Sequence, residues 1–552
     1  MELRNYQEDA TAAILREFEK VNSTLVVLPT GMGKTVIAAA LIKKFYPRRS
    51  MFLAHRDTLI FQAKETIEAH AAVRCDIEMA GYKAEESLFG RATTVISTVQ
   101  TQISGRNGEG RMLKFNPSDF DLLIVDEAHH YTSPGWRKPL EHYKQNPNLK
   151  VLGIPATPDR ADEQALGQIF DSVAFDYEIQ DGIQGGWLVP VEQQFVQIND
   201  LDFSNVRITA GDLNGGDLAK VLEAERVCQG MVGAAIQLVG DRQFVFFTAS
   251  VAHAEMVSNI FNRHRPGMCE WVCESTVREE RQRMLDSYKR KEIQGLANVG
   301  ILTEGWDNRN VAVCFMGRPT CSRALYAQQV GRILRPLDGL VDGPPNPEDR
   351  CAAIAGSAKP TALVVDFVGN AGKHKLITSA DILGGKFPED VIERAVRKAR
   401  EEGKPVRMDE ALDQTAEEIQ AEITKRRFEE EARKAKLVAK VRYHAQNISP
   451  FDVLAIRPSR TRGWDSGRQL SEKQRSVMMK QGIDPNGMPY HEAKQILDEI
   501  FRRWDHGECS FKQARLLRKN ADLLGKQPNQ LSHLSRSEAS ALIDILAYKQ
   551  GW

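Results

Sequence analysis

A glycine turn near the start of this 552-residue chain has the residues of a phosphate-binding loop. The turn, residues 30–35, follows an apolar run typical of a buried strand and precedes one typical of a helix. Glycines allow the backbone to wrap closely around an anion, and unpaired N–H groups at a helix start point at it. In this pattern Lys34 reaches the β- and γ-phosphates of ATP, and the Thr35 hydroxyl ligates Mg²⁺. The residues predicted to bind ATP here are Thr30, Gly31, Met32, Gly33, Lys34 and Thr35.

The match to the phosphate-binding pattern is incomplete, because Leu28 stands where the pattern has its first glycine. Taken without the rest of the chain, these residues could also form a glycine turn that only joins a strand to a helix and binds no phosphate. Residues far downstream decide between the two interpretations.

Two adjacent acids, Asp126 and Glu127, follow the apolar segment 121–125, which we interpret as a strand. Burying unpaired carboxylates is costly, so the pair needs partners. A metal ion and a water molecule supply them: Asp126 is predicted to hold Mg²⁺, and Glu127 to orient and deprotonate an attacking water. Without the glycine turn, a solvated strand end would be the better interpretation.

A predicted helix around residues 324–334 carries Gln328 and two arginines, Arg332 and Arg335. Arg332 and Arg335 are three residues apart, so they are expected to share one helix face and to point together across a cleft.

The elements that must position these groups alternate between strands and helices. Residues 1–195 have strands that end in polar residues, as at the carboxyl edge of a doubly wound parallel sheet. Residues 196–222 break the pattern, with no clear helix, and are expected to form a linker or small excursion. Residues 223–384 repeat the alternation and predict a second α/β domain, with strands at 243–248, 297–302, 311–315 and 362–366.

The remainder of the chain reads as helical. Residues 385–445 are predicted to form a charged connector, and residues 446–552 an accessory region with a weak internal repeat. The repeat pairs 471–475 with 510–514, and 491–497 with 537–543; each copy would be two short amphipathic helices around a loop. The basic residues that lie near Phe501, Trp504 and Phe511 suit a phosphate backbone, and a plain helical scaffold is the alternative. They are Arg502, Arg503, Arg515, Arg518 and Lys519.

Composition adds few constraints. The 74 lysines and arginines balance the 74 aspartates and glutamates, so any nucleic-acid surface must be a local patch. The eight cysteines are scattered, and Cys269 and Cys273 alone lie close together, which favours reduced thiols over a metal site. No signal-peptide pattern and no apolar run near the ~20 residues of a membrane span are present. We expect a soluble, intracellular, cytoplasmic protein without a membrane partner.

The order of these motifs resembles that of a superfamily 2 helicase over residues 1–380. The resemblance is carried by the glycine turn, the Asp-Glu-Ala-His box at 126–129 and the Gln-x-x-Gly-Arg-x-x-Arg segment at 328–335. His55-Arg56 and Thr303-Glu304-Gly305-Trp306-Asp307 make the chain most similar to the xeroderma-pigmentosum-B-type repair helicases and their phage relatives. Asn308-Arg309 departs from the family, which commonly has a proline two residues after the aspartate.

The resemblance implies a fold class and roles for particular residues. The fold is α/β: two tandem RecA-like doubly wound parallel-sheet domains, followed by an all-helical C-terminal region. Gln7, with Arg4, would recognise adenine; Asp307 belongs to the ATP-binding set; and Gln328, Arg332 and Arg335 would face the γ-phosphate. His129 and Thr157 would couple the nucleotide state to the grip on nucleic acid. The residues that would touch the nucleic-acid backbone are Arg56, Gln100, Thr101 and Thr303.

These residues together predict an ATP-dependent DNA helicase or translocase that uses ATP and Mg²⁺. DNA is the expected partner, with a protein partner through the C-terminal region as an addition. An RNA helicase with the same chemistry remains an alternative, as does an ATP-switched motor subunit of a larger nucleic-acid-processing or defence complex.

Overall fold

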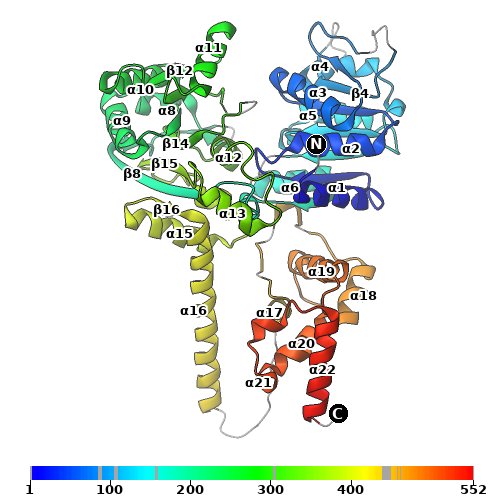
Figure 1. The fold of residues 1–552 in the computed structure, drawn as a ribbon. Helices are drawn as coiled ribbons and strands as arrows, with labels where there is room; N and C mark the ends of the chain where they lie inside the picture. Colours follow the sequence, from blue (N-terminus) through cyan, green and yellow to red (C-terminus); the bar gives the residue numbers. More distant parts are fainter. Residues whose placement is uncertain are drawn as a thin grey trace. The chain divides into compact units, whose positions relative to one another are not determined.

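The computed structural model describes residues 3–84, 90–104, 110–155, 160–209, 211–302, 306–437, 449–456, 458–460, 462–465 and 467–550. The chain divides into two compact units, the first made of residues 1–385 and 389–417, the second of 386–388 and 418–552. Each unit has its own hydrophobic core. Figure 1 shows the strands and helices of unit 1 and the helices of unit 2.

The first sheet of unit 1 has seven strands, all parallel. In spatial order they are β3 (Cys75–Glu78), β4 (Thr94–Thr98), β2 (Ser50–Ala54), β5 (Leu122–Asp126), β6 (Lys150–Ile154), β1 (Ser23–Val27) and β7 (Ser172–Asp176). The strands β1, β2 and β4 are buried along their whole length, which is why they read as continuous apolar or β-branched runs. Strands β2 to β6 lie on one side of β1, and β7 lies on its other side. The chain therefore extends the sheet in both directions from β1, as expected for the predicted doubly wound sheet.

Helices cover both faces of this sheet. One face packs against α1 (Asn5–Phe18), α2 (Lys34–Phe45) and α3 (Asp57–Ala71). The other face packs against α5 (Pro134–Tyr143), α6 (Arg160–Ile169) and the short helix η4 (Ala128–Thr132). The short helices η2 (Arg111–Lys114) and η3 (Pro117–Asp119) precede β5. The five-residue helix α4 (Val99–Ile103) follows β4 directly.

The second sheet also has seven strands. In spatial order they are β12 (Cys269–Val272), β13 (Gly295–Asn298), β11 (Gln243–Phe247), β14 (Val311–Met316), β15 (Ala362–Asn370), β8 (Val191–Asp202) and β16 (Val406–Arg407). All pairs are parallel except β16 with β8. A separate hairpin joins β9 (Ile208–Thr209) to β10 (Asp212–Leu213).

The helices around the second sheet complete unit 1. They are α7 (Ile179–Gln184), α8 (Gly215–Leu222), α9 (Glu225–Val239), α10 (Val251–His264), α11 (Arg278–Lys289), α12 (Arg323–Gly331), α13 (Pro347–Ala355), α14 (Ser379–Leu383) and α15 (Glu389–Glu402). The aromatic side chains of β11, β14 and β15 pack with α9 and α10 in one cluster. Two parallel sheets followed by a helical C-terminal region confirm the predicted fold class.

The structure corrects three expected elements. Residues 196–222 were expected to lack a clear helix, but they contain α8 and the second half of β8, a strand of the second sheet. The strand expected at 297–302 is instead β13, which ends at Asn298, shortly before Gly300 adopts a φ of +69°. The helix expected to reach residue 334 ends earlier, at Gly331. Pro336 further downstream disfavours a helical conformation at Arg335, so the helix could not have continued through the second arginine. The predicted domain boundaries remain predictions.

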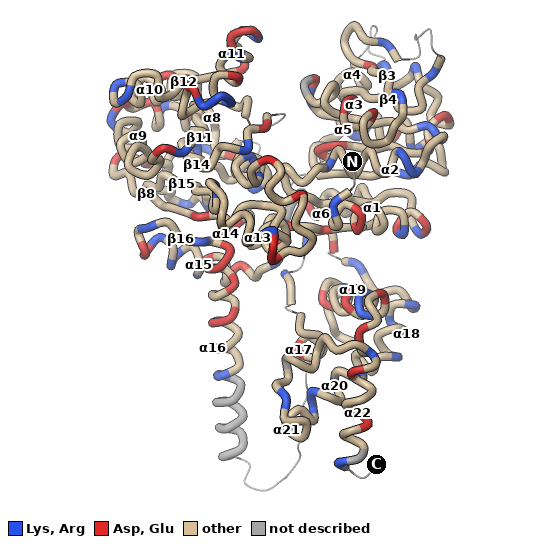
Figure 2. Tube along the Cα trace, viewed as in Figure 1, with Lys and Arg blue, Asp and Glu red and all other residues tan. Residues whose placement is uncertain are grey.

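Helices α15 and α16 (Met408–Leu437) form most of the charged segment after residue 385. Acidic and basic residues are interspersed along α15, whereas the described side chains of α16 are acidic up to Glu422 and basic only at Lys425 and Arg426 (Figure 2). The start of α16 belongs to unit 1, where Met408 and Leu412 are fully buried.

Unit 2 is helical. Its helices are α17 (Pro450–Leu454), η5 (Gly463–Asp465), α18 (Glu472–Gln481), α19 (Tyr490–Asp505), α20 (Phe511–Lys519), α21 (Ala521–Leu524), η6 (Pro528–Leu531) and α22 (Arg536–Gln550). Helices α18 and α20, the starts of the two predicted repeat copies, have the same capping box, in which a serine hydroxyl and a glutamine side chain bond each other's backbone N–H. In the first, Ser471 N donates to Gln474 Oε1 over 2.9 Å; in the second, Ser510 N donates to Gln513 Oε1 over 3.0 Å.

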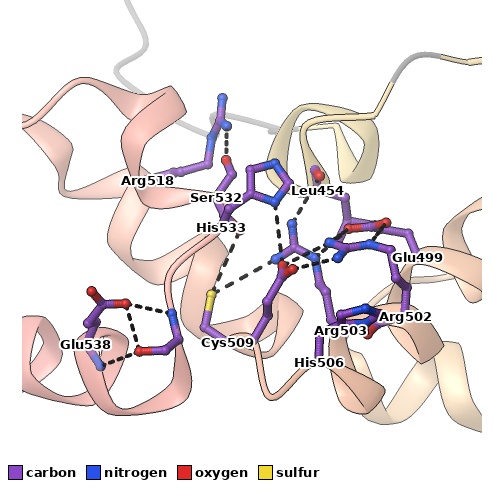
Figure 3. A network of polar contacts seen from close by, with 12 residues as sticks. Leu454, Glu499, Arg502, Arg503, His506, Cys509, Arg518, Ser532, His533 and Glu538 are labelled. Carbon is purple, nitrogen blue, oxygen red and sulfur yellow. Dashed lines mark hydrogen bonds and ion pairs between the residues drawn. The ribbon is translucent and has the colours of Figure 1, made fainter. Parts of the chain in front are cut away.

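A polar network lies inside unit 2 between α19 and the segment before α22 (Figure 3). Arg503, only 1% exposed, pairs with Glu499 at 2.9 Å and donates to the carbonyl of Leu454 at 3.0 Å. Arg502 pairs with Glu499 at 2.8 Å and with Glu508 at 2.6 Å. Arg518 donates to the Ser532 hydroxyl over 2.6 Å. Three of the five residues considered for a phosphate-binding patch are therefore engaged with other groups of unit 2. Phe511, considered with them, is buried.

Candidate nucleotide-binding site and strand-end surface

The glycine turn has the backbone of a phosphate cradle. Gly31 has a φ of +90° and Gly33 a φ of +73°, in the left-handed region that favours glycine. A Cβ at Gly31 would lie 2.6 Å from Nε of Arg335, and a Cβ at Gly33 would lie 2.5 Å from Nε2 of Gln7. Helix α2 begins at Lys34 directly after the turn, so its first N–H groups lack intrahelical partners.

Helix α1 lies against this turn through Gln7. The side-chain amide of Gln7 donates to the carbonyl of Met32 over 3.4 Å, and the Tyr6 hydroxyl donates to the same carbonyl over 2.9 Å. Arg4 pairs with Asp342 at 2.6 Å, and its guanidinium lies 4.8 Å from the ring centroid of Trp187. The two residues predicted to recognise adenine therefore lie beside the phosphate-binding turn.

Aromatic rings that the sequence did not single out surround the same place. Tyr6 stacks on Tyr177 with ring centroids 5.4 Å apart, and its ring meets the edge of Trp187 at 5.6 Å. Tyr177 directly follows β7, and Trp187 lies in the turn after α7. No spacing in the sequence connects these three rings, because they come from three separate elements.

Glu127 follows β5 in a left-handed conformation, with a φ of 49°. Such a backbone is uncommon outside glycine and is often found at functional sites. Oε1 of Glu127 lies 3.9 Å from the Lys34 ammonium, and Oε2 lies 3.4 Å from Nδ1 of His129. The first two predicted motifs thus meet in space.

Electrostatics favours the ionised form of this carboxyl. Burial by itself would raise the pKa of Glu127, but the positive charge of Lys34, followed by His129, His130 and Arg332, lowers the pKa below its usual range. Glu127 is therefore a carboxylate at neutral pH, the form that can orient a water molecule and accept a proton from it.

The residues here fit a divalent cation. Asp126 at the end of β5 and Thr35 in the first turn of α2 offer a carboxylate and a hydroxyl, the oxygen ligands that Mg²⁺ prefers. The buried Oε2 of Glu127 has no hydrogen-bond partner among the described residues. In the adjoining turn, the missing side chains of Gly31 and Gly33 leave room for Arg335 and Gln7 to approach the backbone.

The two predicted arginines approach this site from the second sheet. Arg332 follows the last residue of α12, and its guanidinium donates to the carbonyl of Trp306 over 2.9 Å. Arg335 pairs with Asp307 at 2.6 Å, and its Nε is the atom nearest to the Cβ position of Gly31. The expectation that the arginines share a helix face is wrong, because the helix ends before them, but both contact the segment 306–307. Gln328 is buried within α12.

The residues predicted to touch nucleic acid follow two neighbouring parallel strands. Arg56 comes just after β2, and Gln100 and Thr101 come just after β4, with Ala54 paired to Thr98 at the ends of these strands. The Thr98 hydroxyl accepts a hydrogen bond from the backbone N–H of Thr101 over 3.1 Å and caps α4. Thr157 and Thr303 lie outside the described residues.

A stack of rings connects the end of β2 with the segment that follows Glu127. His55 stacks on His130 at 4.5 Å and on Trp136 at 5.1 Å, and His129 lies 4.2 Å from His130. Burial, followed by repulsion from His129 and His55, lowers the pKa of His130 to about 3. Burial also lowers the pKa of His55. The His-His pair at 129–130 was visible in the sequence, but its contact with His55 was not.

No described helix is both long enough and apolar enough to cross a membrane. The eight cysteines form no disulfide, and burial raises the pKa of Cys75 to about 12.

Two families match the chain. Residues 1–160 match the Type III restriction enzyme, res subunit, and residues 228–336 match the helicase conserved C-terminal domain. The chain is 29% identical over 350 residues to a Saccharomyces cerevisiae protein designated an ATP-dependent helicase, IRC3, covering 60% of this chain and 49% of that protein. It is 26% identical over 348 residues to the Mycobacterium tuberculosis DNA 3'-5' helicase XPB, covering 61% of this chain and 58% of that protein. The chain thus spans about half the length of these relatives.

A solved structure shares the fold. The ATP-dependent Type ISP restriction-modification enzyme LlaBIII bound to DNA aligns with a TM-score of 0.50 at 15% identity, over 100% of this chain and 42% of that one. Both matched regions contribute to the phosphate-binding turn: Gly31 and Gly33 lie in the first and Arg332 and Arg335 in the second, and both regions are similar to ATP-dependent helicases.

Proposed function

We propose that this chain hydrolyses ATP to move along or unwind DNA. The observation that carries the proposal is the convergence of Lys34 and Glu127 from the first sheet with Arg335 from the second at one turn. Arginines that approach a phosphate cradle from a second domain link hydrolysis to domain movement, because they bind only when the domains are together.

Each residue of the site then has a task. Lys34 and the N–H groups after Gly33 hold the triphosphate, and Gln7 with Arg4 holds the adenine edge. Glu127 orients the attacking water and takes its proton, while Arg332 and Arg335 stabilise the charge that develops at the γ-phosphate. Thr35 and Asp126 would hold Mg²⁺, which supplies further positive charge at the phosphates.

The nucleic-acid contacts are proposed at the ends of β2 and β4. Arg56, Gln100 and Thr101 lie on the edge of the sheet that also carries Asp126, so contacts there can respond to the nucleotide. Contacts of this kind reach phosphates rather than bases, so the motor should read little sequence. His129, beside Glu127, and Thr157 are proposed to couple the two sites.

DNA rather than RNA is proposed because the motifs and the mycobacterial relative point to the xeroderma-pigmentosum-B-type branch, whose member is named a DNA helicase. The Asp-Glu-Ala-His box is part of that finer assignment. The proposal also includes a protein partner, which would bind through unit 2. The motif residues lie in unit 1 and do not bear on this partner.

The test is the ATPase rate of the full chain alone and with single-stranded, duplex or forked DNA, or with RNA. Glu127→Gln is the matched control, because it removes the base while keeping the size of the side chain. We expect DNA to stimulate hydrolysis at least tenfold, and Glu127→Gln to bind ATP but lose turnover by about 10²–10⁴-fold.

Other outcomes would overturn parts of the proposal. Stimulation by RNA alone would replace DNA with RNA as the substrate, since dependence on a 2′-hydroxyl identifies RNA. Slow hydrolysis that no polynucleotide stimulates would favour an ATP-dependent switch within a larger complex. Undiminished turnover by Glu127→Gln would remove Glu127 from its role as base.

A further inference from the structure

Lys359 is a buried lysine that none of the motifs contains. It lies in the turn between α13 and β15, and it is only 2% exposed. Lysine is almost never fully buried unless its ammonium has partners, because desolvating the charge is costly. Burial accordingly lowers the pKa of Lys359 to about 7.

The partners of this ammonium are two backbone carbonyls. Nζ of Lys359 donates to the carbonyl of Arg309 over 2.9 Å and to the carbonyl of Arg335 over 2.8 Å. The first carbonyl belongs to the segment 306–310 and the second to the segment that follows α12. One side chain therefore ties together the backbones of the two segments that carry Asp307 and Arg335.

The charges around Lys359 belong to the same two segments. Asp307 attracts the ammonium, and Arg335 and Arg309 repel it. Arg309 in turn pairs with Asp338 at 3.1 Å. The ammonium thus sits within a network in which positive charge exceeds negative charge, held in place by its two hydrogen bonds.

The other links between these segments are made by the arginine side chains themselves. Arg335 pairs with the half-exposed carboxylate of Asp307, and the Arg332 guanidinium donates to the carbonyl of Trp306. An arginine that turns towards a γ-phosphate must give up such a contact. The bonds from Lys359 go to backbone atoms, so they persist while the guanidinium of Arg335 changes partners.

We propose that Lys359 is a positioning residue, which holds the backbone at Arg335 against the segment 306–310 so that the guanidinium reaches the γ-phosphate. The inference rests on the proposed ATP hydrolysis and names a further residue on which it depends. Lys359 touches neither ATP nor water in this role; it acts through Arg335.

The test compares Lys359→Met with Lys375→Met in the full chain. Methionine keeps the length and apolar stem of lysine but cannot donate to either carbonyl. Lys375 is an exposed lysine of the same unit, paired with Glu389, and serves as the matched control. We expect Lys359→Met to lower kcat of DNA-stimulated hydrolysis at least tenfold, with KM for ATP within threefold of the unsubstituted chain, and Lys375→Met to change neither.

A double substitution shows whether Lys359 acts through Arg335. In the Arg335→Ala background, Lys359→Met should lower kcat by less than twofold, because the group that it positions is already gone. A full tenfold loss in that background would overturn the inference, as would a kcat within twofold of normal for Lys359→Met alone. Should Lys359→Met fail to fold, Lys359→Gln is measured in the same way, and an unchanged kcat there would have the same meaning.

The outcomes separate this inference from the proposed function. An unsubstituted chain that hydrolyses no ATP with any polynucleotide contradicts the function itself. Normal stimulated hydrolysis by both the unsubstituted chain and the Lys359 variants contradicts only the role of Lys359.

Discussion

At the scale of single residues, Lys34 lies 3.9 Å from Glu127 beside the phosphate-binding turn, and Arg503 pairs with Glu499 inside unit 2. Lys34, Asp126, Glu127 and Thr35 follow from local pattern, because a phosphate cradle and a strand-end acid pair need those residue types at those positions. Arg503 shows the limit: its neighbours in sequence suggested a phosphate-binding surface, but α19 turns it inwards to Glu499. The rotation of a helix about its own axis decides which of its arginines are buried. That rotation depends on packing against other elements, which a single sequence does not reveal.

Gln7 gives a prediction at this scale. Its side-chain amide lies beside the phosphate-binding turn, so Gln7→Ala should raise KM for ATP and reduce the preference for ATP over GTP. Discrimination of this type depends on hydrogen bonds to the base, and their loss costs about 1–3 kcal/mol. The measurement is kcat/KM for both nucleotides, with the exposed Gln229→Ala as control. An unchanged ratio would mean that Gln7 only supports the turn.

At the scale of elements, strand positions were predicted well and boundaries were not. The apolar runs of β5, β11 and β14 match the strands closely, because buried parallel strands have no competing pattern. The end of α12 was misplaced because Arg332 and Arg335 have helical spacing even though the backbone has left the helix. The sequence also gave no indication that the end of β2 would meet the segment after Glu127 through a stack of imidazole rings.

That stack predicts a pH dependence. The folded state lowers the pKa of His130 to about 3, below its usual value of 6.5, so the folded state binds fewer protons than the unfolded state between these values. Its contribution to stability is therefore present above pH 6.5 and is lost as the pH falls towards 3. His130→Phe keeps a ring in the stack and cannot be protonated.

Thermal unfolding measured between pH 7 and 4.5 checks this expectation. His130→Phe should lose less thermal stability over that range than the unsubstituted chain, whereas the exposed His264→Phe should behave like the unsubstituted chain. Equal losses for all three proteins would mean that His130 is not the group whose protonation opposes folding.

The capping boxes of unit 2 give a second prediction for elements. Ser471→Ala and Ser510→Ala each remove the hydroxyl that accepts from the N–H three residues later. Each should destabilise its own helix by about 1 kcal/mol. Hydrogen exchange at α18 and α20 measures the effect locally, with Ser476→Ala, an exposed serine inside α18, as the control. Loss of protection in both variants at both helices would instead indicate that the two copies unfold together.

At the scale of the whole molecule, the sequence predicted two parallel sheets in tandem but not which segments complete the second one. β8 precedes every other strand of that sheet in the chain and pairs with β15, the last strand but one. Such a pairing is invisible to periodicity, because a buried strand looks the same in either sheet. The membership of β16 was equally hidden, since two residues form it after a charged helix.

The position of β8 decides where this chain can be shortened. Its outer edge is covered by β16, while Arg400 of α15 lies 5.1 Å from the ring centroid of Phe195 and Gln194 donates to the carbonyl of Gly403 over 3.3 Å. A chain ending at residue 384, where the charged region begins, would leave this edge bare and free to pair with another molecule. We expect residues 1–384 to self-associate and residues 1–417 to remain monomeric by light scattering. A shortened chain that keeps only the two sheets must therefore include residues 385–417, because α15 and β16 cover the outer edge of the second sheet.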